Sequence, residues 1–125
     1  MEICLLAAGA TVRLGIAALT LAWTHSVQKT RWEEDWHLTA AGLVLAETRI
    51  EGSGAGMDPA PEARFNGRWW RWRPDLPPQQ QVVLRRSGAT ADWDLCRADA
   101  CRPLGALVPT GADPVILARC PPDAR

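Results

Sequence analysis

Residues 17–38 read AALTLAWTHSVQKTRWEEDWHL, and apolar and polar side chains alternate along this stretch. The larger apolar side chains fall on the odd positions of residues 17–27 and on the even positions of residues 32–38. Side chains spaced two residues apart lie on one face of an extended strand. The stretch therefore predicts two antiparallel strands that share a buried face and are joined by a turn at Lys29-Thr30.

The same alternation continues along the rest of the chain, and no long stretch has the i, i+3, i+4 spacing of an amphipathic helix. Clusters of glycine and proline separate the alternating segments, as turns require. We expect about eight or nine short strands, the remaining ones at residues 3–8, 43–51, 65–73, 82–86, 92–97, 100–104 and 115–120. This pattern predicts an all-β chain with a single domain, residues 1–125, built as an antiparallel β-sandwich or a partly closed barrel.

The composition excludes several classes of protein. The 14 basic and 14 acidic residues cancel, which argues against general nucleic-acid binding because that depends on excess positive charge. A hydrophobic content of 47% is too high for a disordered chain. The uncharged run at residues 14–28 is shorter than the roughly 20 apolar residues of a membrane-spanning helix, so no transmembrane segment is expected. The start Met1-Glu2 also lacks the positive charge of an export signal, so no signal peptide is expected.

The first hairpin carries a polar pair on its apolar face. With a two-residue turn, Trp23 lies opposite Trp36, and His25 lies opposite Glu34. Lys-Thr is not a preferred pair for such a turn, so a longer, bulged loop is the alternative. The pair is enclosed on that face by Trp23, Trp32 and Trp36. Burial raises the pKa of a carboxyl group and lowers that of an imidazole, whereas pairing does the opposite. We favour a structural pair that satisfies two buried polar groups, and the alternative is a His–carboxylate dyad for proton transfer or ligand recognition.

The next turn adds to this candidate site. If Leu38 faces Leu43, then Glu34 approaches Glu47 on the neighbouring strand. The same register brings Arg49 next to Trp32. A second carboxylate and a guanidinium then join the surface around Glu34.

The glycines that follow are a further candidate. Gly52, Gly54 and Gly56 stand at alternate positions and are either a backbone nest for an anion or, as we favour, a turn that leaves the strand. They lack the Lys-Ser/Thr of a P-loop and the spacing of the dinucleotide fingerprint. No catalytic motif is complete, and we expect no metal site and no cofactor.

The four cysteines predict two disulfides. Cys96 and Cys101 flank Ala98-Asp99, and a hairpin turn there places them opposite each other, within disulfide reach. A bond between Cys4 and Cys120 ties the first strand to the last. An even number of cysteines in a small all-β domain fits an oxidising compartment, which favours a periplasmic location, against the lack of a clear signal peptide.

A tryptophan-rich strand is the last candidate. Trp69, Trp70 and Trp72 alternate with arginines between Arg68 and Arg73. Cross-strand packing with arginine stems over indoles is the commoner arrangement, and the alternative is a glycan-binding platform. That alternative requires the three rings to lie exposed on one side of the sheet.

Several segments together resemble one family. Trp23-Thr24-His25-Ser26-Val27, Lys29-Thr30 and Trp32-Glu33-Glu34 resemble the signature W-x-H-S-V-E-K-T-x-W-E-E, with Gln28 in place of the acid and Arg31 in place of a usual proline. The other matching segments are Gly52–Met57, the tryptophan-rich strand, Arg73-Pro74, Pro77-Pro78, Leu95-Cys96 and Cys101-Arg102-Pro103-Leu104. The chain resembles domain-of-unknown-function family 1850 over nearly its whole length.

The resemblance implies a context and no activity. Members of this family are typically encoded beside TAXI-type TRAP transporter subunits, and many carry an N-terminal membrane or export segment. We therefore expect a non-enzymatic accessory β-domain that binds TRAP-type membrane subunits or their small-molecule substrate. The alternatives are a small enzyme that uses His25 and Glu34 and, more weakly, a glycan-binding module.

Overall fold

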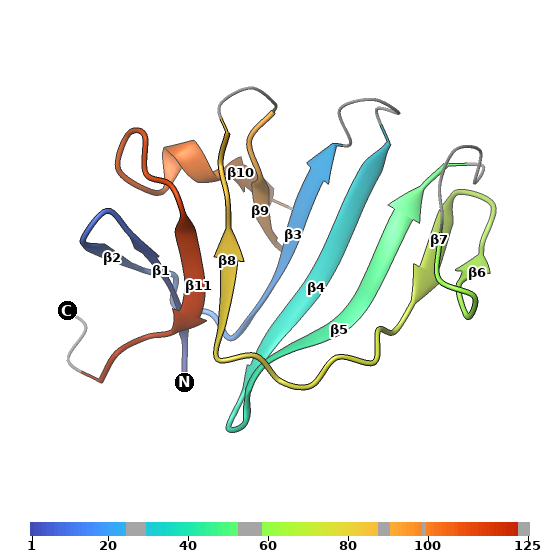
Figure 1. Cartoon of the computed structure of the whole chain (residues 1–125), viewed down its shortest axis with the longest axis horizontal. Helices are drawn as coiled ribbons and strands as arrows, with labels where there is room; N and C mark the ends of the chain where they lie inside the picture. Colours follow the sequence, from blue (N-terminus) through green and yellow to red (C-terminus); the bar gives the residue numbers. More distant parts are fainter. Residues whose placement is uncertain (25–29, 53–58, 88–90, 99, 123–125) are drawn as a thin grey trace.

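The computed structural model describes residues 1–24, 30–52, 59–87, 91–98 and 100–122. Within these ranges the chain forms eleven β-strands and one short 3₁₀ helix, η1 (Leu104–Ala106). The strands form two antiparallel sheets that pack against each other (Figure 1). The predicted all-β, sandwich-like architecture is confirmed. No helix in the described ranges has the length and hydrophobicity that crossing a membrane requires.

The larger sheet contains β3 and β4, which come from residues 17–38. Its strands lie in the order β10-β9-β3-β4-β5-β7-β6. In chain order they are β3 (Ala18–Thr24), β4 (Arg31–Thr39), β5 (Gly42–Glu51), β6 (Arg64–Phe65), β7 (Trp69–Trp72), β9 (Asp94–Arg97) and β10 (Ala100–Pro103). The three longest strands, β3, β4 and β5, are the ones whose alternation is clearest in the sequence.

The predicted strand at residues 65–73 is instead a hairpin of β6 and β7. The Asn66 side chain accepts hydrogen bonds from the backbone N–H groups of Arg68 and Trp69, at 3.0 and 2.8 Å. Gly67 supplies a left-handed φ of 98°. A short polar side chain followed by glycine is typical of a turn, which is why the strand is interrupted there.

The smaller sheet joins both ends of the chain. Its order is β2-β1-β11-β8, with β1 (Ile3–Ala7), β2 (Ala10–Arg13), β8 (Gln81–Leu84) and β11 (Val115–Arg119). β2 follows the turn at Ala8-Gly9 and is a strand that the alternation did not predict. Both predicted disulfides are present, Cys4–Cys120 beside the β1–β11 pair and Cys96–Cys101 across the β9–β10 hairpin. The register of that hairpin, with Arg97 opposite Ala100, is also as predicted.

The hydrophobic core lies between the sheets. Fully buried leucines from the smaller sheet (Leu5, Leu117) pack with leucines from the larger one (Leu21, Leu43). The larger sheet is wider than the smaller one, and β4, β5 and β7 extend beyond it on the right in Figure 1. Part of the inner face of the larger sheet therefore lies beyond the described strands of the smaller sheet.

A close approach at Gly42 connects the two sheets. Leu43 and Gln79 exchange two backbone hydrogen bonds of 2.8 Å just before β8. Gly42 has a φ of 130°, and a Cβ atom there would lie 2.7 Å from the carbonyl oxygen of Gln79. Glycine is required at this position because any side chain would collide with that backbone.

We expect Gly42→Ala to lower the free energy of unfolding by about 2–3 kcal/mol, since it combines backbone strain with the collision. The control is Gly67→Ala, at a φ of 98° with no atom within 4 Å, which should cost only about 1 kcal/mol. Urea unfolding measures both variants. Equal losses would show that the approach to Gln79 contributes nothing.

Candidate functional site

The register of the first hairpin differs from the prediction. Trp23 pairs with Trp32, and Leu21 pairs with Glu34, which is a shift of four residues. The two rings stack with centroids 5.9 Å apart, and the connection after Thr24 is longer than a two-residue turn. The predicted placement of Glu34 opposite His25 is therefore wrong, because Lys-Thr does not favour a tight turn. His25 itself lies outside the described residues.

A β-bulge changes the other predicted neighbours of Glu34. Leu38 does face Leu43, as expected, but the register shifts between Asp35 and Trp36. Ala46 is the extra residue on β5, since Asp35 pairs with Glu47 and Trp36 pairs with Leu45. A one-residue insertion moves the following side chains to the opposite face. The predicted approach of Glu47 to Glu34 and of Arg49 to Trp32 is therefore wrong, and Thr48 and Ile50 take those places.

On the outer face of the sheet, Arg49 is the centre of a charge network. Its guanidinium donates to Glu33 at 2.7 Å and to Asp35 at 2.8 and 3.0 Å. Arg31 donates to Glu33 at 2.6 Å, and Arg71 forms an ion pair with Glu47. Burial acts to raise the pKa values of Glu33 and Asp35, but the arginine hydrogen bonds outweigh it and hold both pKa values below their usual range. Each carboxylate in this network pairs with an arginine, so we infer that the network stabilises the fold and does not bind a ligand.

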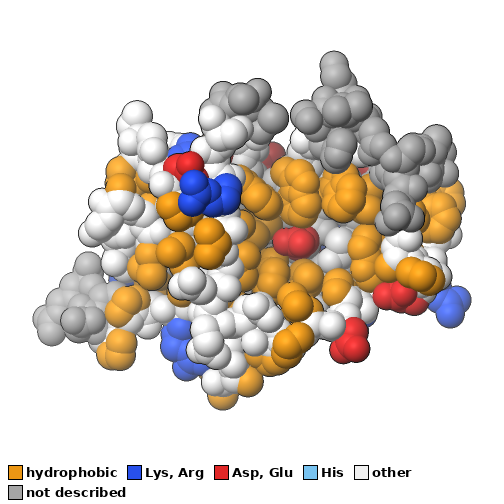
Figure 2. All heavy atoms as spheres, viewed as in Figure 1, with side chains coloured by type: hydrophobic (Ala, Val, Ile, Leu, Met, Phe, Trp, Pro, Cys, Tyr) orange, Lys and Arg blue, Asp and Glu red, His pale blue; other side chains and the backbone are white. Residues whose placement is uncertain are grey.

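The inner face carries the aromatic residues. Cross-strand partners share a face, so one row across the sheet is Leu21, Glu34, Thr48 and Trp72, and the next is Trp23, Trp32, Ile50, Trp70 and Phe65. We name the side chains of Trp23, Trp32, Trp70 and Trp72 the tryptophan face. All four are half-buried. Figure 2 shows hydrophobic side chains gathered over β4, β5 and β7, with acidic atoms among them.

Glu34 is the polar group at the edge of the tryptophan face. Trp32 and Trp36 stand two residues before and after it on β4, on the same side of the strand. Trp36 is almost fully buried in the core, and its indole N–H donates to the Glu34 carboxyl group at 3.1 Å. No lysine or arginine in the described ranges forms an ion pair with Glu34. Desolvation raises the pKa of Glu34, and the Trp36 hydrogen bond opposes this only in part.

We expect Glu34→Gln to raise the free energy of unfolding at pH 7 by on the order of 1 kcal/mol. Because folding raises the Glu34 pKa, the protonated carboxyl group is favoured in the folded state. Its stabilising effect is full below the unfolded-state pKa of about 4.3 and is lost as the pH rises through the folded-state pKa. Urea unfolding at pH 7 and pH 3 should show a gain that disappears in acid. A variant less stable than wild type at pH 7 would contradict this.

The other predicted site residues are dispersed. Gly52 directly follows β5 with a φ of 133°, and its N–H donates to the carbonyl oxygen of Arg68, which continues the pairing with β7. Gly54 and Gly56 lie outside the described residues. Trp69 is on the outer face, with the Arg68 guanidinium 5.4 Å from its ring centroid. Trp70 and Trp72 are on the inner face. The three rings do not form one platform, which the glycan-binding hypothesis required.

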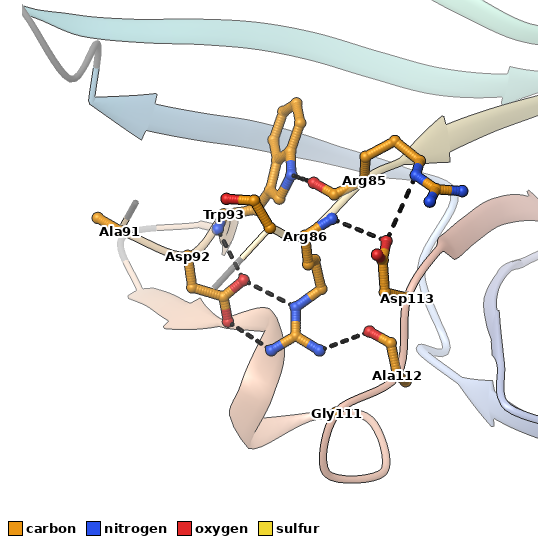
Figure 3. A pocket seen from close by; sticks show the side chains of 9 residues that line it. Arg85, Arg86, Ala91, Asp92, Trp93, Gly111, Ala112 and Asp113 are labelled. Carbon is orange, nitrogen blue, oxygen red and sulfur yellow. Dashed lines mark hydrogen bonds and ion pairs between the residues drawn. The ribbon is translucent and has the colours of Figure 1, made fainter. Parts of the chain in front are cut away.

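A pocket of about 480 Å³ lies elsewhere, at the end of β8 (Figure 3). The Arg86 guanidinium donates to both carboxylate oxygens of Asp92, at 3.0 and 3.1 Å, and to the carbonyl oxygen of Ala112 at 2.8 Å. Asp113 accepts the Arg86 backbone N–H at 2.9 Å, and Arg85 lies 3.5 Å from the same carboxylate. No sequence motif indicated this cluster. The two arginines and the two aspartates of this pocket pair with each other, so the pocket has no unpaired charge to offer a ligand among these four residues. Glu34, by contrast, forms no ion pair with a described residue.

The two sheets define a sandwich-like all-β protein with four half-buried tryptophans on the inner face of its larger sheet. The family model described as "Domain of unknown function (DUF1850)" matches residues 19–104, and the chain belongs to this family. The matched span covers nearly all of the larger sheet, including Glu34 and the tryptophan face. No match was found among the curated proteins or among the solved structures.

Proposed function

We propose that the chain is a non-enzymatic ligand-binding β-domain, and that the tryptophan face with Glu34 is its binding surface. The observation that carries this proposal is the Glu34 carboxyl group, which accepts a hydrogen bond from Trp36 on the side of β4 that also carries Trp32, without a cation from the described residues. Burying an unpaired carboxyl group is costly, and so is leaving large aromatic rings in water. Ligand sites combine such apolar surfaces with a few placed polar groups.

The geometry favours binding over catalysis. The cross-strand neighbours of Glu34 are Leu21 and Thr48, and neither is an acid or a base. General acid–base catalysis needs a positioned partner within hydrogen-bond reach of the reacting groups. The enzymatic alternative depends on His25, whose predicted pairing with Glu34 is replaced by Leu21.

The family resemblance supports a context for this binding. We propose that the protein acts at the outer side of the inner membrane, as an accessory of a TAXI-type TRAP uptake system. The two disulfides support an extracytoplasmic location because such bonds persist in oxidising compartments. Its partner in this proposal is the transporter or the small molecule that the transporter carries.

A thermal-shift screen tests the binding part of the proposal. The panel contains organic acids, amino acids, amines and sugars, and the protein is used as wild type, Glu34→Gln and Glu51→Gln. Glu51 is the matched control because it lies on the outer face and pairs with the exposed Arg68. We expect at least one compound class to stabilise the wild type and Glu51→Gln but not Glu34→Gln. Stabilisation that is equal in all three proteins would contradict the assignment of the site.

Deleting the gene and measuring TAXI-dependent uptake tests the context. We expect uptake to fall on deletion, to recover with the wild-type gene and to stay low with Glu34→Gln. Unchanged uptake in the deletion strain would overturn the transport role while leaving the binding result intact.

A further inference from the structure

Glu34 differs from the other acidic residues of β4 because no arginine of the described residues pairs with it. Glu33 and Asp35, its two neighbours on β4, both accept hydrogen bonds from Arg49 on the outer face. Glu34 faces the other way, where its described partner is the indole N–H of Trp36. The sheet thus neutralises the adjacent acids with an arginine and leaves this one carboxyl group without a counter-charge from the described residues.

The tryptophan rings near Glu34 favour the same kind of ligand as the unpaired carboxylate. Trp32 stacks on Trp23, with ring planes 25° apart, so an extended indole surface begins two residues from the carboxyl group. Trp72 lies in the same cross-strand row as Glu34, beyond Thr48. The π faces of indoles carry negative electrostatic potential and attract cations, tryptophan most strongly. The carboxylate and the rings therefore both favour a positively charged ligand.

The same features disfavour the other ligand classes. An anion would meet the Glu34 carboxylate and the negative ring faces together. A sugar needs several hydrogen-bonding partners, and the described polar side chains of this row are Glu34 and Thr48. A neutral apolar ligand would cover the half-buried carboxylate further and supply no counter-charge, which is costly.

We propose that the tryptophan face binds an organic cation, a quaternary or protonated amine with apolar substituents, and that the Glu34 carboxylate is its counter-charge. This inference rests on the proposed function and specifies the ligand class. The ammonium group contacts the carboxylate and the adjacent indoles, and the substituents lie along the remaining rings. The Glu34 carboxylate then takes the place of water molecules that hydrate the free cation.

Three probes of matched shape test the inference by calorimetric titration at pH 7.5: choline, the neutral 3,3-dimethyl-1-butanol and the anionic 3,3-dimethylbutyrate. They differ chiefly in charge, so apolar contact is nearly constant across the series. We expect choline to bind at least about tenfold more tightly than the neutral analogue, from the cation–π and carboxylate contributions together. We expect no measurable binding of the anion.

Variants locate the effect. Glu34→Gln should reduce the affinity for choline by about threefold or more, towards that of the neutral analogue, because the carboxylate contribution is lost while the cation–π contribution of the indoles remains. Glu51→Gln should leave the affinity within about twofold of wild type. Far-UV circular dichroism confirms that both variants are folded. Equal or tighter binding of the neutral analogue, an unaltered affinity in Glu34→Gln, or no binding of choline overturns the cation assignment. The thermal-shift screen then decides separately whether the surface binds a different class of ligand.

Discussion

Replacing Cys4 and Cys120 together by alanine is expected to lower the free energy of unfolding by about 4–5 kcal/mol. This bond closes a loop with a sequence separation of 116 residues, so it removes much of the entropy of the unfolded chain. It also stands beside β1 and β11, the two central strands of the smaller sheet. The loss would consume a large part of the stability of a domain of this size.

The second disulfide is the matched control for this prediction. Cys96 and Cys101 have a sequence separation of only 5, and the same entropic argument gives only about 2 kcal/mol for their replacement by alanine. Urea unfolding without reductant measures both double variants. If the short-loop pair cost as much as the long-loop pair, the entropic explanation would have to be abandoned.

Arg49→Ala is the second large effect, with an expected loss of about 2–3 kcal/mol. The arginine side chain is only 15% exposed, and its removal leaves Asp35 without its hydrogen-bonding arginine and Glu33 with Arg31 alone. Both carboxyl groups have lowered pKa values in the folded state, so their stabilising effect is present above about pH 4 and is lost as the pH falls. In the variant, this acid-dependent part of the stability should shrink.

Arg71→Ala is the control, because Arg71 pairs with Arg49 in register and lies on the same face. Its side chain is 46% exposed, and the loss of its ion pair with Glu47 should cost less than about 1 kcal/mol. Chemical unfolding at pH 7 and pH 3 compares the two variants. Equal losses at pH 7 would mean that the outer network is not centred on Arg49.

The sequence predicted which side chains share a face, but it did not fix their register. Moving β3 by four residues against β4 leaves Trp23, Trp32 and Trp36 on one face, because any even shift preserves the alternation. The partner of Glu34 nevertheless changes to Leu21. Only the length of the connection could have distinguished these registers, and Lys-Thr is a weak turn signal.

The bulge in β5 corresponds to a change of alternation in the sequence. The inward side chains are Leu43 and Leu45 before Ala46, and Thr48 and Ile50 after it, so the apolar positions change from odd to even. That change predicts an extra residue between them. By contrast, the Cys96–Cys101 pair could be predicted in full because a short hairpin fixes both partners locally.

The most direct test of the tryptophan face as a binding site is the indole ¹H–¹⁵N spectrum of the protein, which contains seven tryptophans, during titration with choline. Assignment uses single Trp→Phe variants. We predict that the signals of Trp32 and Trp36 move with increasing choline, while that of Trp69, on the outer face, stays in place. The Trp36 signal should respond because its indole N–H donates to the Glu34 carboxyl group. Movement confined to Trp69, or no movement of Trp32 and Trp36 at saturating choline, would contradict the account.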